Sequence, residues 1–174
     1  MMIKRIIFKG LLVVAMMSVF QLTAFAGEDS FEMSSKKIEN AQTFVSENLA
    51  RVVGSPRGML ISSVELSITD LGAGTVELYG NVLCHEPMEK IKLNLFLDKW
   101  SSAENDWNQI EKFPFTWLAE DYPNEDLTMA FGAVEVPNLE RGIEYRARGI
   151  AGAWDLDSNL YEVFNAGTSS ILVE

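Results

Sequence analysis

Apolar and polar residues alternate with a period of two over much of this chain, and this pattern limits its fold more than any other feature. In the clearest segment, residues 90–98, the apolar positions are Ile91, Leu93, Leu95 and Leu97. Successive side chains of a β-strand point to opposite faces, so such a segment buries one face and exposes the other. Comparable segments recur between turns rich in Gly, Pro, Asn and Asp. The sequence therefore predicts an all-β fold.

These segments predict about seven short strands. They lie near residues 63–68, 76–84, 90–98, 107–117, 127–136 and 139–154, followed by one interrupted or two short strands within 160–173. Such a series, with no long helix, is typical of an antiparallel β-sandwich. Pro114 places its segment at a sheet edge or a bulge. Gly132 is interpreted as a bulge that shifts the apolar phase of segment 127–136.

The first 26 residues have the features of a secretory signal. A basic start is followed by the apolar run 11–20 and by small residues at positions 24 and 26, which predicts cleavage between Ala26 and Gly27. The run is too short for a permanent membrane span, although an uncleaved anchor is the alternative. No cysteine lies at the cleavage point itself to carry a lipid. We expect a secreted, extracellular protein with no stable membrane anchor after cleavage.

Two further segments complete the predicted organisation. Residues 27–56 are expected to form a flexible N-terminal segment. A short amphipathic helix is predicted within residues 36–49, where Ile38, Ala41, Val45 and Leu49 have near-helical spacing. The Gly- and Pro-containing segment 54–58 breaks that pattern. The sandwich domain is therefore predicted over residues 57–174.

The chain is acidic. It holds 14 Lys and Arg against 25 Asp and Glu, a net charge of −11. Loss of the signal would remove Lys4, Arg5 and Lys9 and leave 11 cations against the same 25 acids, or −14. Nucleic acids and anionic membranes require a basic surface, so neither is an expected partner. Cationic partners, divalent ions or simple solubility fit this charge.

No catalytic combination is visible in the sequence. Cys84 is the only cysteine, so it has no partner for an intramolecular disulfide, and its phase predicts a buried, inert thiol. His85 is the only histidine and would face away from Cys84 on a strand. No nucleophile elbow and no zinc ligand set is present, and no cofactor is expected. We predict a protein that is not an enzyme; a small glycan-directed hydrolase using unrecognised carboxylates is the alternative.

Exposed aromatic residues are the candidate ligand-binding groups. Trp100, Trp117 and Trp154 lie near strand ends, and Tyr79 and Phe96 fall on outward phases. Such rings can stack on sugars or on a protein partner, although packing within the fold is the alternative. Trp100 is also expected to pack on Trp107 across the hairpin that joins their strands.

The metal candidate is weak calcium binding at Asp155, Asp157 and Asn159. Their alternating oxygen ligands resemble the start of a calcium loop. Leu160 and Ala166 occupy the places where such a loop needs glycine and glutamate, so it is not an EF-hand. A solvated turn is the alternative. A second acidic cluster contains Glu120, Asp121, Glu125 and Asp126.

Several short motifs resemble those of a known family. They are Arg57-Gly58, the run 67–72 (Ser-Ile-Thr-Asp-Leu-Gly), Glu89-Lys90-Ile91, Trp107, and the run 142–149 (Gly-Ile-Glu-Tyr-Arg-Ala-Arg-Gly). Residues 57–174 thereby resemble a family of small secreted β-sandwich proteins from Gram-positive, largely anaerobic bacteria, a domain of unknown function. That resemblance implies fold and export and no activity. The family's histidine after the last motif is missing here, where residues 151–153 are Ala-Gly-Ala.

The segment 139–154 is also similar to the sixth strand of fibronectin type III domains. Leu139, Gly142 and Tyr145 have the spacing found there, which implies a tyrosine corner in which Tyr145 bonds back to the preceding turn. Arg146 and Arg148 would share the opposite face, where acids such as Glu144 or the nearby loops are expected to neutralise them; an anion site is the alternative. The likeness implies an immunoglobulin- or fibronectin-like β-sandwich and says nothing about a ligand.

The sequence thus favours a secreted, non-catalytic β-sandwich used for binding or surface display. Its expected partner is an unknown protein or glycan. Membership of a larger extracellular assembly through exposed strand edges is a further alternative.

Overall fold

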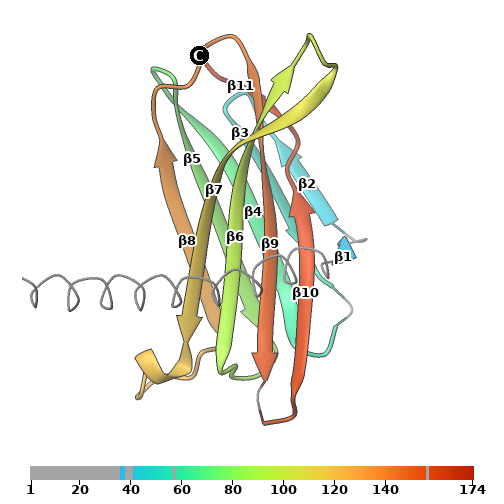
Figure 1. Cartoon of the computed structure of the whole chain (residues 1–174), viewed down its shortest axis with the longest axis vertical. Coiled ribbons are helices and arrows are strands. Elements are labelled where there is room, and N and C mark those ends of the chain that lie inside the picture. Colours follow the sequence, from blue (N-terminus) through green and yellow to red (C-terminus); the bar gives the residue numbers. More distant parts are fainter. Residues whose placement is uncertain (1–35, 38–40, 57, 156) are drawn as a thin grey trace, which may run out of the picture. The chain divides into compact units, whose positions relative to one another are not determined.

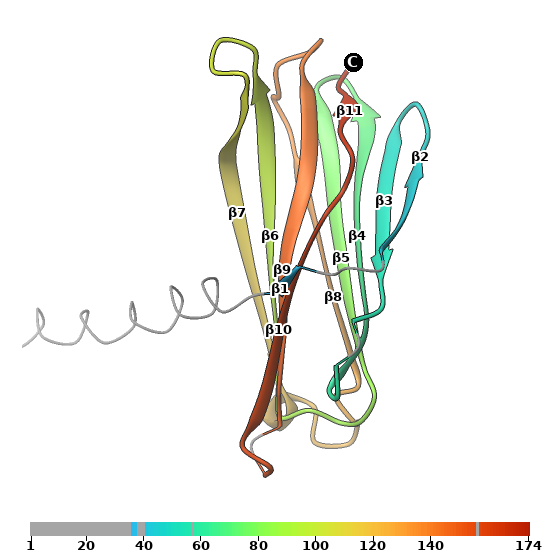
Figure 2. The same cartoon turned by 90° about the vertical axis from the view of Figure 1, so that its right-hand side faces the viewer.

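The strands of the protein form two facing sheets (Figures 1 and 2). The computed structural model describes residues 36–37, 41–56, 58–155 and 157–174. The elements are β1 (Lys36–Lys37), β2 (Ala41–Val45), β3 (Leu49–Gly54), β4 (Ile61–Gly72), β5 (Thr75–Cys84), β6 (Lys90–Ser101), β7 (Asp106–Leu118), the 3-10 turn η1 (Ala119–Asp121), β8 (Met129–Val136), β9 (Glu144–Asp155), β10 (Leu160–Gly167) and β11 (Ile171–Leu172).

Sheet A has the strand order β1-β10-β9-β6-β7, and β11 pairs with β9 beyond the end of β10. Sheet B has the order β2-β3-β4-β5-β8. All pairs are antiparallel except the short pair of β1 with β10, which is parallel. The predicted all-β sandwich is therefore confirmed, and of the two alternatives for the end of the chain, the structure has two strands, β10 and β11.

The core lies between the sheets and follows the predicted alternation. Ile91, Leu93, Leu95 and Leu97 of β6 are fully buried in it. Glycines let the sheets approach closely. A Cβ at Gly149 of sheet A would lie 2.6 Å from the nearest side-chain carbon of Leu66 in sheet B. Side chains from one sheet therefore fill space left by glycines in the other.

The predicted helix over residues 36–49 is wrong in the part that the structure describes. Residues 36–37 form β1, residues 41–45 form β2, and Leu49 begins β3. All five residues of β2 are exposed, so the near-helical spacing marks no buried stripe. In β3, Ala50 and Val52 are buried at alternate positions against β4, which requires a strand.

The sandwich begins before the predicted boundary at residue 57. β2 and β3 extend sheet B, and β3 contributes to the core. The predicted signal peptide and its cleavage point after Ala26 lie outside the described residues. Among the residues that are described, no helix is long and apolar enough to span a membrane.

The predicted bulge at Gly132 is also wrong. β8 pairs with β5 in unbroken register from Val136 to Met129, and Gly132 faces inward. The Phe115 ring occupies the space beside it, 2.9 Å from where a Cβ would stand. An aromatic side chain from β7 thus replaces the missing side chain, while Met129 and Phe131 are exposed on the outer face. Register shifts occur instead between β6 and β7, at Leu97 and Asp98, and near both ends of the pair of β4 with β5.

One carboxylate links the two sheets. Glu162 of β10 accepts hydrogen bonds from the backbone N–H groups of Met59, Leu60 and Ile61, at 3.0 Å for the last two. These amides precede and begin β4 of sheet B. Gly58 lies so close to this carboxylate that a Cβ there would overlap it.

Candidate functional site

The outer face of sheet A gathers cations that are scattered in the sequence. Strand register and pleat place five of them there. We call the outward-facing residues of β6, β7 and β9 the basic face; its cations are Lys90, Lys92, Lys112, Arg146 and Arg148. The acids with the same orientation on these strands are Asp98 and Glu144. On these three strands of a protein with a net charge of −11, the described outward positions thus hold five cations and two acids.

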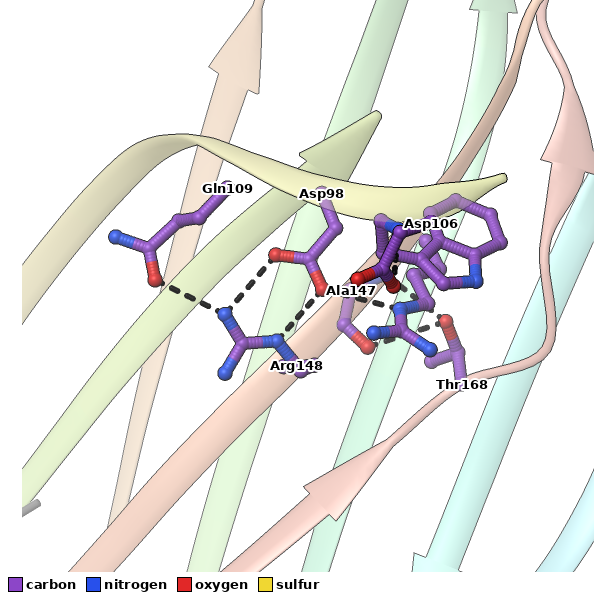
Figure 3. Close-up of polar contacts among 8 residues, drawn as sticks. Asp98, Asp106, Gln109, Ala147, Arg148 and Thr168 are labelled. Carbon is purple, nitrogen blue, oxygen red and sulfur yellow. Dashed lines mark hydrogen bonds and ion pairs between the residues drawn. The ribbon is translucent and has the colours of Figure 1, made fainter. Parts of the chain in front are cut away.

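Asp98 joins two of these cations (Figure 3). Arg148 donates from Nε to Oδ2 at 2.6 Å and from Nη2 to Oδ1 at 3.0 Å, while Arg146 donates from Nε to Oδ2 at 3.0 Å. Arg148 also donates to Gln109 Oε1 at 2.9 Å. The Asp98 side chain is 1% exposed, whereas the arginine side chains are 30% and 36% exposed. One buried negative charge thus supports two partly exposed positive ones.

Aromatic rings hold the two guanidinium groups in place. Arg146 lies 4.5 Å from the ring centroid of Trp107, and Arg148 lies 4.9 Å from that of Phe96. Trp107 contacts Trp100 edge-on at 5.3 Å, so the predicted packing across this hairpin is confirmed. Such stacking restricts arginine rotamers and fixes the direction of the remaining N–H groups.

The predicted outward orientation of Phe96 is present, but the ring is buried and not exposed. Arg148 and the Lys112 ammonium, 5.9 Å from the ring centroid, lie over it. Phe96 is therefore a support for cations and not a free stacking surface.

The three predicted ligand-binding tryptophans lie in different places. Trp100 is near one end of β6, and Trp154 is opposite Lys90 at the other end. The Trp154 ring stacks on Tyr161 at 6.5 Å with the Lys90 ammonium 4.5 Å from its centroid. Trp117 stacks on Phe115 and packs against the core from the inner side of β7. Trp100 and Trp154 accordingly border the basic face, and Trp117 belongs to the packing.

A cavity of about 420 Å³ lies beside the arginines. The pairing of β10 with β9 ends where Gly167 lies opposite Arg148, and the pairing of β11 with β9 starts where Ile171 lies opposite Tyr145. The strand pairing along this side of β9 is therefore interrupted between Tyr145 and Arg148. Thr168 bridges this break: its Oγ1 accepts from Ala147 N–H at 3.0 Å and donates to Ala147 C=O at 3.3 Å.

The lining of this cavity combines charge with small side chains. Arg146, Arg148 and Asn165 contribute polar groups from sheet A, and Ala41 and Val52 contribute apolar groups from sheet B. Its size is within the range of small-molecule sites. The cavity thus lies at the break in strand pairing, and Arg146 and Arg148 are among the residues that line it.

The acid that neutralises the arginines is not the one that the sequence suggested. Glu144 accepts a hydrogen bond from Ser170 at 2.9 Å, and Asp98 is the ion-pair partner. The spacing of Arg146 and Arg148 placed them on one face correctly. Asp98 has the outward phase of its strand, but only the register between β6 and β9 brings it opposite Arg146.

The predicted calcium residues lie in the turn between β9 and β10. Asp155 Oδ1 accepts from the backbone N–H groups of Asp157 and Ser158 at 3.1 and 3.2 Å, and its Oδ2 accepts from the Ser158 hydroxyl. These bonds, the hydroxyl bond first, lower the pKa of Asp155. Within the described residues, no three His, Cys, Asp or Glu side chains are grouped so as to hold a metal. Asp155 organises a turn, and Glu120, Asp121, Glu125 and Asp126 are exposed.

Cys84 is buried as predicted. Burial, and secondarily the charge of Glu162, raises the pKa of its thiol from 9.0 to about 12. The adjacent His85 is exposed, and its backbone N–H donates to Leu60 C=O at 2.9 Å.

Tyr145 makes the contact of a tyrosine corner. The Glu140 N–H donates to Tyr145 Oη at 3.1 Å, and this hydroxyl lies 3.4 Å from Glu140 C=O. Gly142 has a φ of 76°, which favours glycine, and its N–H donates to Val173 C=O. Leu139 packs against the core. These three residues fix the turn before β9, which carries both arginines.

No protein-family model and no curated protein sequence matches this chain. The resemblance to a secreted bacterial family therefore stays a prediction.

Proposed function

We propose that this protein is an exported, non-catalytic binding module whose ligand contacts the basic face of sheet A. The observation that carries the proposal is the pair of arginines held by Asp98. Their orientation is fixed by hydrogen bonds and ring contacts before any ligand arrives. Preorganised groups on regular strands lose little conformational freedom on binding.

The charge distribution supports the same proposal. Simple solubility would be served by the surplus of acids alone, yet five cations share one face. A local concentration of one sign steers oppositely charged ligands to that face. Trp154 and the 59% exposed Tyr161 add a stacked aromatic surface at one end of the face.

We also propose that the fold is immunoglobulin- or fibronectin-like, and the order of the strands supports this. The immunoglobulin letters A, B, C, E, F and G can be given in chain order to β4, β5, β6, β8, β9 and β10. Sheet B then contains A, B and E as neighbours, and sheet A contains G, F and C, with β7 beside C. The contact between Tyr145 and Glu140 is consistent with this assignment. The fold hosts many functions, so the ligand must be argued from the face itself.

A binding screen tests the proposal. The purified protein would be applied to a glycan array and to bacterial surfaces beside the variants Trp154→Ala, Trp100→Ala and Arg148→Gln. We expect binding by the parent and reduced binding by all three variants. Arg51→Gln is the matched control, because Arg51 pairs with Glu65 in sheet B, 2.6 Å apart. Equal binding by the parent and the sheet A variants would refute a ligand site on this face.

Assembly through strand edges is a second candidate, favoured by β2. This edge strand of sheet B is exposed at all five positions, including Phe44 and Val45. Unpaired edges of this kind can accept another strand. Light scattering at several concentrations would reveal oligomers that the variant Thr43→Pro should disrupt; a monomer at all concentrations would reject self-assembly.

A further inference from the structure

We propose that the cavity beside Arg146 and Arg148 binds a small carboxylate-bearing molecule, with a uronic acid as the representative ligand. This inference rests on the proposed function and specifies the chemistry of one part of the basic face. It adds a cavity site to the surface considered above.

The first step concerns charge. Two guanidinium groups share a single carboxylate, Asp98, so the cluster retains one positive charge. Asp98 is 1% exposed, whereas both arginine side chains reach solvent. A ligand therefore approaches the arginines and not their internal acid. One negative charge on the ligand completes the neutralisation.

The second step concerns the shape of the ligand's charged group. Arginine binds planar carboxylates through parallel N–H groups and is constrained here by the rings of Trp107 and Phe96. A phosphate monoester carries nearly two negative charges at neutral pH and would leave an excess of negative charge in an already acidic protein. A carboxylate matches both the planar donors and the single residual charge.

The third step concerns the uncharged part of the ligand. The cavity of about 420 Å³ is lined by both arginines, by the end of β10, and by one residue each from β2 and β3. Asn165 lines it together with the small side chains of Ala41 and Ala166. This volume accommodates a ligand the size of one sugar, with its carboxylate at the arginines.

Amide NMR spectra test the proposal directly. The full chain would be titrated with glucuronate and with glucose, which has a similar ring but no carboxylate. We expect glucuronate to shift the amide signals of Ala147, Gly149, Gly167 and Thr168, with glucose at least about tenfold weaker. A third titration uses an oligomer of uronic acids. If the natural ligand is the end of a polymer, the protein should bind the oligomer at least as tightly as glucuronate; if it is a free acid, the oligomer should bind more weakly.

Two variants and a control locate the site. Ala41→Trp should block the cavity without altering the arginines, and Arg148→Gln should weaken glucuronate binding by about tenfold or more. Arg51→Gln should bind as the parent does. Unchanged binding by Ala41→Trp, or signals that shift equally with glucose or with inorganic phosphate, would overturn the proposal.

The failure of this inference can be told from the failure of the proposed function. Array binding that depends on Trp154 and Arg148 but is unaffected by Ala41→Trp and glucuronate would reject the cavity and retain the face. Absence of any binding in both experiments would reject both.

Discussion

Arg148 of β9 holds the buried carboxylate of Asp98 on the neighbouring strand β6 through two hydrogen bonds, of 2.6 and 3.0 Å. The same carboxylate accepts a bond from Arg146, two residues along β9. A charge this deeply buried is tolerated because both of its oxygens are bonded to cations. The pair therefore determines stability as well as the properties of the basic face.

Removal of the Asp98 charge should destabilise the fold. In Asp98→Asn, two arginines lose their counterion, although their exposed portions regain water. We expect the free energy of unfolding to fall by about 2 kcal/mol. Urea denaturation followed by tryptophan fluorescence measures it. Glu104→Gln, in the exposed β6–β7 loop, is the charge-matched control, and equal midpoints for the two variants would contradict the role given to Asp98.

The Cys84 thiol should be unreactive in the native protein. Its pKa of about 12 leaves almost no thiolate at pH 8, and the side chain is 5% exposed. We expect a thiol reagent to label Cys84 after denaturation and not before it. Because the folded pKa exceeds the unfolded value near 9.0, the contribution of this thiol to stability should be constant below pH 9 and fall as pH rises from about 9 to 12. Rapid labelling without denaturant would show that the site opens.

The turn between β9 and β10 should lose stabilisation as the pH falls, whereas the contribution of Cys84 is lost as the pH rises. Hydrogen bonds from Ser158 lower the pKa of Asp155 below 3.8. The stabilisation that ionised Asp155 contributes is fully present above pH 3.8, its ordinary pKa, and is lost as the pH falls through its lowered pKa. Ser158→Ala should move the carboxylate's titration, followed by carbon NMR, back toward 3.8. An identical titration in parent and variant would mean that the hydroxyl bond does not persist in solution.

A substitution at Ala73 should stabilise the hairpin between β4 and β5. Ala73 has a φ of 56° and precedes Gly74 with a φ of 72°, a two-residue turn that favours Asn-Gly. We expect Ala73→Asn to raise the free energy of unfolding by about 0.5–1 kcal/mol. Ala133→Asn, an exposed position within β8, should destabilise the sheet instead. A loss of stability at Ala73 would show that the turn differs in solution.

Strand alternation was readable from the sequence because each strand of the central hairpins buries one face. It predicted β6, and the placement of Cys84, correctly. It misassigned the phase of β8, because Phe115 from another strand fills the inward position at Gly132. It also missed β2, since an exposed edge strand has no apolar periodicity of its own. It missed β3 as well, whose buried side chains, Ala50 and Val52, are only two.

The candidate site depended on information that alternation does not contain. The shared face of Arg146 and Arg148 follows from their spacing alone. Their contact with Asp98 depends on a register between strands separated by nearly fifty residues. The cavity depends on where β10 leaves β9, and there the Thr168 hydroxyl bonds to the backbone of Ala147, which no recognisable motif announces.

The hydrogen bonds between Glu162 and three backbone amides can form only late in the synthesis of the chain. This carboxylate joins the chain near its end to residues about a hundred positions earlier. Long loops must close before such contacts form, which slows folding. A chain emerging from a ribosome or a translocation pore would therefore lack this connection between its sheets until β10 is released. A truncation that stops before residue 160 should remain susceptible to protease.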